Sequence, residues 1–520
     1  MNSNMGKRTI LKKTIQAGSA TFLSRLFGIV REVLFGRFLG VNAISDAFLA
    51  AFKIPVFLRK LLAEGALSAA SVPIFVKRMK EGKQDQANSL MTVSFIFFEG
   101  FILLLCVFVF FFPDVVLRVV APGFSAEQIN YAVPFLRIMF PMILFISSSA
   151  LLASALQAAN HFFIPAFAPV LLNISLVTAL ILCLSFDLSA YWLCFGALFG
   201  SVLFFLAHLI VYFNYNFNFF RINETAKQDF WELLRKFIFC LFGVGIVEIN
   251  LYLDMILSSY LPKGSVSLVH YAGRFMNIPL GVLAISFSTV LLSQLSRISL
   301  YAPSRLKFYV LESAKFITFL VIPSMLFLIF SAEKIFSILM FGKNINPENI
   351  FIAKWLLIIY CTGLVFFSLN KIFVNVFYSL KDTFTPTIAL AASTIINFIG
   401  NIVGMYFWGI YGLAGSTVVS AIALTFLCLH FLKTKHGIIF YSANFFNFIG
   451  RFLIQILLAC AFFIISYFSF LKYFEGTYWY LFFSQQWGYW FVVFTLAFLS
   501  FIFIFFSRKI FGLKLYFLSK

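Results

Sequence analysis

The sequence predicts an all-α integral membrane protein with about fourteen transmembrane helices. Of its 520 residues, 62% are hydrophobic and only 11% are charged. A soluble domain of this length cannot bury so much apolar surface. Apolar stretches near or above the ~20 residues that a spanning helix needs recur along the whole chain. The 7 cysteines lie singly in such stretches, so neither a disulfide framework nor a cysteine metal site is indicated.

The predicted spanning segments alternate between two sides of a membrane. Lysines and arginines gather at the N-terminus, in alternate connections and at the C-terminus. This bias places both termini in the cytoplasm and explains the net charge of +20 without nucleic-acid binding. The first stretch is interpreted as a retained span, since no small-residue cleavage site follows it. The segments are 12–38, 43–76, 88–112, 129–157, 162–186, 189–214, 233–261, 265–295, 308–331, 351–379, 384–409, 412–432, 447–471 and 486–507.

Two local patterns occur once in each half of the chain. Lys53-Ile54-Pro55 is echoed by Asn277-Ile278-Pro279, and the run 157–165 is echoed by 378–386 at nearly the same offset. Chance similarity within apolar sequence is the alternative explanation. A duplication is typical of transporters, which hold substrate between their repeats.

The spacing of these echoes predicts three parts. They are an N-terminal six-helix lobe over 1–225, a C-terminal six-helix lobe over 226–445, and two further transmembrane helices with a cytoplasmic tail over 446–520.

Cations occur inside the apolar segments, where each costs ~2.5–3.5 kcal/mol near the membrane centre and normally faces water or a counter-charge. In the first segment, Arg25 and Arg31 are six residues apart. At 100° per residue they do not share a face of a regular helix. Both can line one cavity only if it wraps around the helix or the helix is locally unwound, and Gly28 between them permits a bend.

The second segment carries a row of charges interrupted by proline. Asp46, Lys53 and Lys60 are seven residues apart and lie on nearly one face. Pro55 removes a backbone donor and kinks the helix, which redirects Arg59. A broken helix with charges at membrane depth is a recurrent way to line a substrate cavity. Asp46 is interpreted as a counter-ion for the arginines, as a gate that changes partner during transport, or as both.

Arg274 brings a cation from the second half of the chain. A guanidinium presents five donors in a planar fork and suits phosphate better than an ammonium does. Several such groups converging from both halves would suit a diphosphate. The alternative is that these cations pair with helix ends or lipid headgroups.

Oxygen-bearing side chains in the second half are candidate ligands for a monovalent cation such as Na⁺. They are Asp254, Asn397, Asn401 and Thr417, with Glu248 as an alternative to Asp254. A small hard cation prefers such oxygens, whereas interhelical hydrogen bonding is their ordinary use in membranes. No other cofactor is expected. No catalytic motif is found, so an enzyme is not predicted.

Several runs resemble the MurJ (MviN) family of lipid II flippases, within the superfamily of multidrug, oligosaccharidyl-lipid and polysaccharide exporters. They are SRLFGIVREVLFGRFLG at 24–40, SDAFLAAFKIPVFLRKLLAEGALSAASVPIF at 45–75, QAANHFFIPAFAPVLLNI at 157–174, and the segment around Arg274. The resemblance implies two six-helix lobes around a cationic cavity, followed by two helices that form a lipid-facing groove. By position, the family's essential cavity charges correspond to Arg25, Arg31, Asp46, Arg59 and Arg274, and Glu32 takes the place of the acid after the second arginine.

Lys53 joins these charges in the expected substrate-binding set, because it too is a cation inside an apolar stretch. The substrate would be the undecaprenyl-diphosphate-linked muropeptide, lipid II, moved to the outer leaflet of the bacterial inner membrane by alternating access. Further partners would be membrane lipids and cell-wall synthesis or division proteins, with no nucleic acid. The alternatives are a cation-coupled drug exporter, an exporter of another polyprenyl-diphosphate oligosaccharide on the same fold, and a scaffold for cell-wall enzymes that transports nothing.

Overall fold

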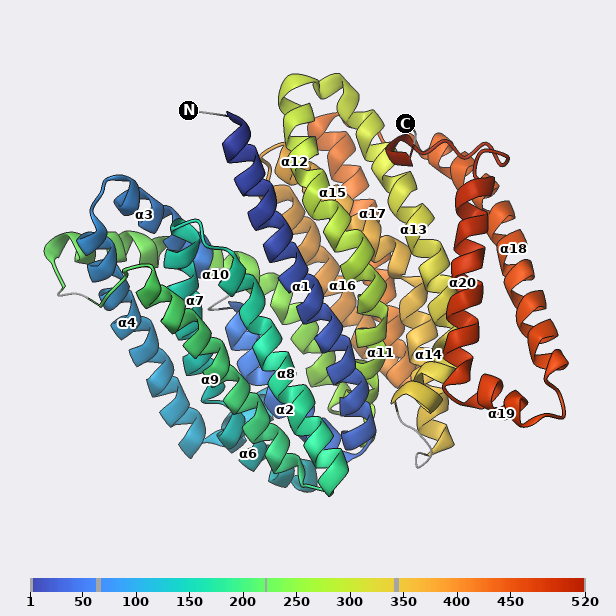
Figure 1. Ribbon diagram of the computed structural model, residues 1–520, viewed down its shortest axis with the longest axis horizontal. Coiled ribbons are helices and arrows are strands. Elements are labelled where there is room, and N and C mark those ends of the chain that lie inside the picture. The colour runs from blue at the N-terminus through green and yellow to red at the C-terminus, as the bar shows by residue number, and fades with distance from the viewer. Residues whose placement is uncertain (1–2, 62–66, 220–221, 341–345, 519–520) are drawn as a thin grey trace. The chain divides into compact units, whose positions relative to one another are not determined.

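The computed structural model describes residues 3–61, 67–219, 222–340 and 346–518 (Figure 1). These residues form helices joined by short turns, and no β-strand occurs among them. Eleven helices or continuous helical runs within them are long and apolar enough to cross a membrane. This confirms the predicted all-α, multi-pass membrane class. The chain divides into two compact units, Met1–Ser267 and Leu268–Lys520, here called the first and the second unit. The predicted boundaries at 225/226 and 445/446 remain proposals.

The first unit contains the predicted spans up to residue 261. Its helices are α1 (Ser3–Leu39), α2 (Ala43–Leu58), α3 (Ser68–Lys80), α4 (Gln84–Phe111), α5 (Pro113–Val120), α6 (Ala126–Met139), α7 (Met142–Ala158), α8 (Phe163–Phe186), α9 (Ala190–Asn214) and α10 (Glu224–Ser258). Apolar side chains of α3, α4, α7, α9 and α10 form a buried cluster within it.

The second unit follows, although α11 begins three residues before the boundary. Its elements are α11 (Ser265–Pro279), the π-helix η2 (Leu280–Ile285), α12 (Ser286–Tyr301), the 3₁₀ turn η3 (Pro303–Arg305), α13 (Leu306–Lys334), the π-helix η4 (Ile335–Met340), α14 (Pro347–Thr362), α15 (Leu364–Ser379), α16 (Phe384–Trp408), α17 (Ile410–His436), α18 (Ser442–Tyr473), α19 (Tyr478–Gln485), α20 (Gly488–Ser507) and the 3₁₀ turn η5 (Tyr516–Leu518). The last two predicted spans are α18 and α20, which pack against each other and are joined through α19 (Figure 1).

The echoed prolines interrupt their helices in a similar way. Pro55 lies in the last turn of α2, and π-helical residues follow at 59–61. Pro279 ends α11, and the π-helix η2 follows at once. Because proline has no N–H to donate, the hydrogen-bond ladder is broken at this point and a wider turn can form. The predicted segment 43–76 thus contains α2 and α3, with the predicted kink after Pro55, and residues 62–66 between them lie outside the described residues.

The connection between α7 and α8 matches that between α15 and α16. The end of α15 lies as many residues after the end of α7 as the start of α16 lies after the start of α8. One non-glycine residue in each connection has a left-handed backbone: Asn160 and Lys381, both with φ 61°. The sequence echo between 157–165 and 378–386 is therefore also a structural echo.

Side chains at these connections pair at matching positions. His161 Nδ1 lies 2.9 Å from the Tyr215 hydroxyl. At the corresponding positions of the second half, His436 Nε2 lies 2.8 Å from the Asp382 carboxylate. The Thr385 backbone N–H also donates to Asp382, at 2.9 Å. Burial acts to raise the pKa of Asp382, but hydrogen bonds from Thr385 and His436 outweigh it and lower the pKa to about 2. The repeat thus keeps the position of this contact while its chemistry has changed.

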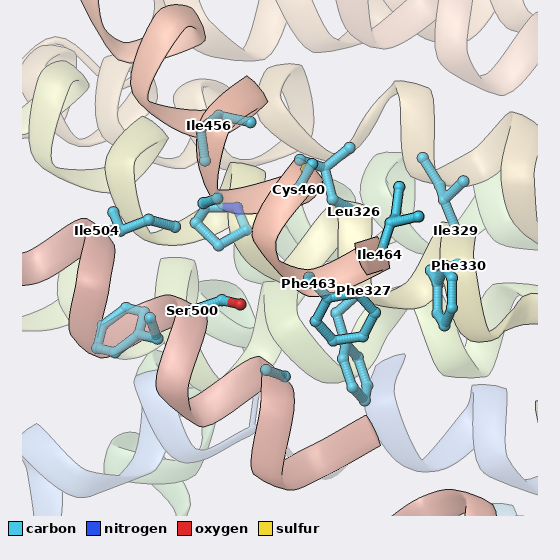
Figure 2. Close-up of a pocket in the computed structure, with 14 residues that line it drawn as sticks. Leu326, Phe327, Ile329, Phe330, Ile456, Cys460, Phe463, Ile464, Ser500 and Ile504 are labelled. Atoms are coloured by element: carbon cyan, nitrogen blue, oxygen red, sulfur yellow. The ribbon is translucent and has the colours of Figure 1, made fainter. Parts of the chain in front are cut away.

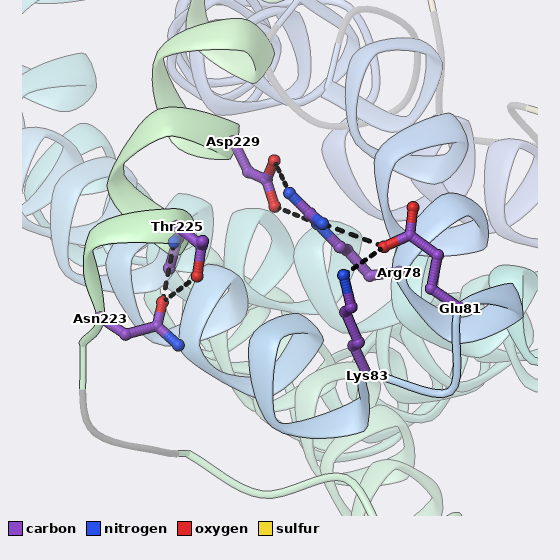
Figure 3. Close-up of polar contacts among 7 residues, drawn as sticks. Arg78, Glu81, Lys83, Asn223, Thr225 and Asp229 are labelled. Carbon is purple, nitrogen blue, oxygen red and sulfur yellow. Dashed lines mark hydrogen bonds and ion pairs between the residues drawn. The ribbon is translucent and has the colours of Figure 1, made fainter.

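An ion-pair network joins α3 to α10 in the first unit (Figure 3). Arg78 binds Asp229 through two parallel contacts, Nε–Oδ2 at 2.6 Å and Nη2–Oδ1 at 2.7 Å. Its Nη1 lies 3.0 Å from Glu81, which also pairs with Lys83 at 3.2 Å. Such a bidentate arginine–carboxylate pair fixes geometry as well as charge. The network therefore secures the α3–α4 connection to the start of α10.

The helices α16 and α17 approach each other at a pair of glycines. A Cβ atom added at Gly412 would lie 2.0 Å from the carbonyl oxygen of Gly404, and one added at Gly404 would lie 2.8 Å from that of Gly412. These are backbone atoms, so they can move only if a whole helix moves. Small residues allow such close packing of membrane helices.

Gly412→Ala is therefore expected to destabilise the second unit by about 1–3 kcal/mol, the usual cost of overpacking. The measurement is the thermal stability and monodisperse yield of the detergent-solubilised protein. Gly415→Ala, on the same helix with nothing within 4 Å of the added Cβ, is the matched control. Equal stability of the two variants would contradict the close approach of α16 and α17.

Candidate functional site

Arg31 is fixed within the first unit by contacts to α1 and α8. Its Nη1 donates to Asn173 Oδ1 at 2.8 Å, and its Nη2 lies 2.5 Å from Glu32 Oε1. The guanidinium also lies over the Phe35 ring, 5.5 Å from its centroid. Asn173 in turn donates to the backbone oxygen of Ser24 at 3.1 Å. Arg31 is thus oriented by one acid, one amide and one aromatic ring.

The Arg31 guanidinium has donor capacity left over. Its side chain is only 13% exposed. Its Nε–H is buried and has no acceptor among the residues that the structure describes. A buried donor without a partner costs ~1–3 kcal/mol, so an anionic oxygen placed there would be stabilised.

α1 is an uninterrupted α-helix from Ser3 to Leu39. The alternative of local unwinding around Gly28 is therefore wrong. On this regular helix Arg25 and Arg31 point about 120° apart. Consistent with that separation, Arg25 is exposed whereas Arg31 is largely buried. Arg25 and Arg31 can therefore line one cavity only if that cavity wraps around α1.

Asp46 is almost fully buried in the first unit and is held by neutral donors. Its Oδ2 accepts hydrogen bonds from the Gly264 N–H at 2.6 Å and from Gln128 Nε2 at 3.1 Å. Its Oδ1 accepts from the Ser267 N–H at 2.8 Å and the Ser267 hydroxyl at 2.9 Å. No lysine or arginine of the described first unit forms an ion pair with it. This carboxylate therefore connects α2, α6 and the start of α11.

Local backbone features place Asp46 for these contacts. It lies in the first turn of α2, where the helix dipole favours a negative charge. Asn42 and Ser45 form a capping box that fixes the start of this helix. Gly264 has φ 94°, and a Cβ atom there would lie 2.6 Å from a methyl group of Val41. Glycine at 264 therefore permits the close approach that brings its N–H to Asp46.

Lys53 of α2 and Lys60, which follows the end of α2, contact α10. The Tyr252 hydroxyl donates to the backbone oxygen of Lys53, and Lys60 Nζ pairs with Glu248 at 3.0 Å. Glu248, considered above as a cation ligand, is thus engaged by a lysine. Arg59 is half-buried in the π-helical turn that follows α2.

The second unit contains the remaining predicted cation, Arg274. It lies in α11 with its side chain exposed. Nearby, the Asn277 amide donates to the backbone oxygen of Gly273 at 2.8 Å.

Three of the four predicted cation ligands lie together in the second unit. Asn401 Nδ2 donates to Asn397 Oδ1 at 3.1 Å, and Asn397 Nδ2 donates to Thr417 Oγ1 at 3.4 Å. Both asparagines are fully buried. Asp254 belongs to α10 of the first unit. Among the described residues there is no group of three or more His, Cys, Asp or Glu side chains that could hold a metal ion. The contact between Asn397 of α16 and Thr417 of α17 is the one expected of interhelical hydrogen bonding, whereas Asn397 and Asn401 belong to one helix.

An apolar cavity of about 260 Å³ lies between α13, α18 and α20 (Figure 2). Ser500 is its only polar side chain, and the lining includes Phe327, Phe330, Phe463 and Phe501. The resemblance implied a groove formed by the last two helices, but the contribution of α13 was not predicted. No sequence pattern could have assigned α13, because it lies more than a hundred residues before α18.

Comparison with known proteins covers nearly the whole chain. A sequence model of the family described as "Lipid II flippase MurJ" matches residues 35–498. The chain is 30% identical over 469 residues to the probable lipid II flippase MurJ of Buchnera aphidicola subsp. Schizaphis graminum, covering 88% of this chain and 89% of that protein. It is also 30% identical over 451 residues to the probable lipid II flippase MurJ of Vibrio cholerae, covering 82% and 84%.

Solved structures agree with these sequence relatives. The structure described as "Lipid II flippase MurJ, inward closed conformation" matches with a TM-score of 0.77 and 27% identity, over 95% of this chain and 99% of that chain. An inward-facing multidrug transporter of the MATE family matches with a TM-score of 0.67 at 14% identity, over 81% of this chain and 99% of that one. The second likeness is one of fold alone. Taken together, the family match and the relatives show that this chain belongs to the lipid II flippase MurJ family.

Proposed function

We propose that this chain moves lipid II, the undecaprenyl-diphosphate-linked muropeptide, from the inner to the outer leaflet of the bacterial cytoplasmic membrane by alternating access. Membership of the MurJ family along nearly its full length supports the proposal most directly. In this role the chain is a transporter and not an enzyme.

Arg31 is the side chain best suited to hold the diphosphate. Its Nε–H lacks an acceptor among the described residues, and its contacts with Asn173 and Glu32 hold the guanidinium in place. Hydrogen bonds between a guanidinium and phosphate are about twice as strong as neutral ones. Arg25, Lys53 and Arg59 are proposed as the other cations of this site in the first unit, and Arg274 of the second unit is proposed as a further cation that binds the substrate.

Asp46 is proposed as the gate. Its four hydrogen bonds connect α2, α6 and the start of α11. Releasing a buried carboxylate from neutral donors requires only that water or another donor replace them. A change of partner at Asp46 could therefore accompany the opening of one side.

The lipid chain is proposed to lie along the apolar cavity of α13, α18 and α20. Its lining is almost entirely hydrocarbon and aromatic. A polyprenyl chain there would stay among apolar groups while the headgroup occupies a polar site.

The proposed orientation has both termini in the cytoplasm. It rests on the basic residues at the chain ends and in alternate connections. A potential negative inside would then favour outward movement of the anionic headgroup by ~2.3 kcal/mol per charge per 100 mV. Membrane lipids are the other proposed partners, together with cell-wall synthesis or division proteins.

The test of this function is rescue of a bacterial strain depleted of its own flippase. The readout is the leaflet location of labelled lipid II, measured by its accessibility to a probe that cannot cross the membrane. Growth and outer-leaflet lipid II should both return when this chain is expressed. Growth without lipid II at the outer leaflet would favour the scaffold alternative. If neither growth nor outer-leaflet lipid II returns, the proposal is excluded.

We further propose that Asn397, Asn401 and Thr417 of the second unit bind Na⁺ during the cycle. Thr417→Val is expected to remove any stimulation of lipid II translocation by Na⁺ over K⁺ in membrane vesicles. Thr425→Val is the matched control, because Thr425 is another threonine of α17 whose hydroxyl forms hydrogen bonds. Equal Na⁺ stimulation in wild type and Thr417→Val would rule out this site.

A further inference from the structure

A second, basic pocket of about 660 Å³ lies in the second unit, where α13 begins and the chain turns back after α20. Four cationic side chains and a single carboxylate line it. They are Lys315, Arg508, Lys509 and Lys514, with Glu312 as the acid. The substrate proposal above does not use this pocket.

The segment after α20 folds back onto α13 and α18 and forms one wall of the pocket. Leu513 and Leu515 are each only 3% exposed and pack in a cluster with Phe319 and Phe452. Lys514 lies between these two leucines and is exposed. This alternation buries the apolar side chains and leaves the lysine facing out of the protein.

Polar contacts hold the tail in this position. Glu312, which is 6% exposed, accepts a hydrogen bond from the Tyr516 N–H at 3.1 Å. Arg508 donates to the backbone oxygens of Phe505 at 2.8 Å and Leu518 at 3.3 Å. The pocket wall is therefore a built part of the fold.

The positive charges of the pocket are poorly balanced. Glu312 pairs with Lys315 at 2.7 Å, which uses the only acid that lines it. Arg508 contacts carbonyl oxygens, which carry no full charge. Lys509 and Lys514 form no ion pair with any residue that the structure describes. Three positive charges thus remain for an anionic ligand.

The surroundings place the pocket at the boundary between water and hydrocarbon. The hydroxyls of Tyr309 and Tyr516 lie 3.1 Å apart, and the Phe308 ring packs on Tyr516 at 5.3 Å. Tyrosines gather at membrane interfaces because they have an apolar ring and a polar end. Along α13, the apolar cavity begins at Pro323, about 12 Å beyond Lys315 at 1.5 Å per residue. A ligand held here would have hydrocarbon on one side and water on the other.

We propose that this pocket binds the phosphate headgroup of an anionic phospholipid of the surrounding bilayer. Basic pockets at the ends of transmembrane helices are suited to such headgroups. The acyl chains would extend along α13 and α20 at the depth of their apolar residues. The lipid would thereby hold the C-terminal segment against α13.

The test is a titration of the purified protein with dioleoyl phosphatidylglycerol, followed by native mass spectrometry. The double variant Lys509→Gln/Lys514→Gln is expected to bind this lipid about thirtyfold more weakly than wild type, since each lysine near a headgroup contributes ~1 kcal/mol. Lys509→Arg/Lys514→Arg should bind as wild type does. The matched control is Lys433→Gln/Lys472→Gln, which removes two exposed lysines of the same unit outside the pocket.

Three outcomes would overturn the proposal. One is unchanged phosphatidylglycerol binding by the glutamine variant. Another is equal binding of dioleoyl phosphatidylcholine, which carries no net charge, by wild type. A third is a loss of polyprenyl diphosphate binding with phosphatidylglycerol binding intact, which would assign the pocket to the transported substrate. Arg31→Ala should leave phosphatidylglycerol binding unchanged, so the result does not depend on the translocation proposal.

Discussion

Arg31→Ala is expected to abolish rescue of a flippase-depleted strain and the appearance of labelled lipid II in the outer leaflet. The variant removes a guanidinium whose Nε–H has no acceptor in the described part of the chain, and it leaves Asn173 and Glu32 without their cation. Each charge-assisted hydrogen bond to a phosphate is worth about 1.5–3 kcal/mol. Losing two of them would weaken binding of the diphosphate at least a hundredfold.

One further variant separates charge from geometry at this position, and another on the same helix serves as a control. Arg31→Lys keeps a positive charge but loses the planar fork, so translocation should be reduced but still measurable. Arg37→Ala, on the same helix six residues later, should rescue growth. Membrane levels of all three proteins must match wild type, because a poorly expressed variant also fails to rescue. Full rescue by well-expressed Arg31→Ala would remove Arg31 from the substrate site.

The class of fold and the repeat could be predicted because both depend on residues that are close together in the sequence. Apolar length identifies a spanning helix without any knowledge of its neighbours. The echo between 157–165 and 378–386 marks a helix end, a turn and a helix start, all of which depend on residues close in the chain. The structure reproduces each of them at the same offset in the second half.

The partners of the charged residues could not be predicted, because they come from distant parts of the chain. Asp46 receives hydrogen bonds from Gly264 and Ser267, which are 218 and 221 residues away. Arg31 meets Asn173 across 142 residues. Composition shows that a buried charge needs partners, but only packing selects them. The basic pocket was not predicted for the same reason, because lysines that follow α20 and residues of α13 line it together.

The break in the second predicted segment was foreseen only in part. Pro55 indicated a kink, and the chain does leave α-helical geometry just after it. Whether a proline bends a helix or ends it depends on whether neighbouring groups satisfy the freed carbonyls. Those neighbours are tertiary contacts, so the sequence predicts the position of the break but not its geometry.

Asp46→Asn is expected to be nearly as harmful as Asp46→Ala, although it is close in shape. Each carboxylate oxygen accepts two hydrogen bonds, and one of each pair comes from a backbone N–H, of Gly264 or Ser267. An asparagine has a single oxygen, so whichever way its amide turns, its NH₂ group faces one of these N–H donors. Two donors at 2.6–2.8 Å repel each other, and an unsatisfied buried donor costs ~1–3 kcal/mol.

Hydrogen–deuterium exchange of the peptide that contains residues 264–267 measures this effect and separates the two interpretations of Asp46. If the carboxylate is a gate, exchange there should become about tenfold faster or more in Asp46→Asn, and translocation should fall with it. Asp114→Asn, an exposed acid in the first turn of α5, should change neither. Lost translocation with unchanged exchange would instead favour a counter-ion, since that role depends on the charge and not on the donors around it. Unchanged exchange and full translocation would leave Asp46 with neither role.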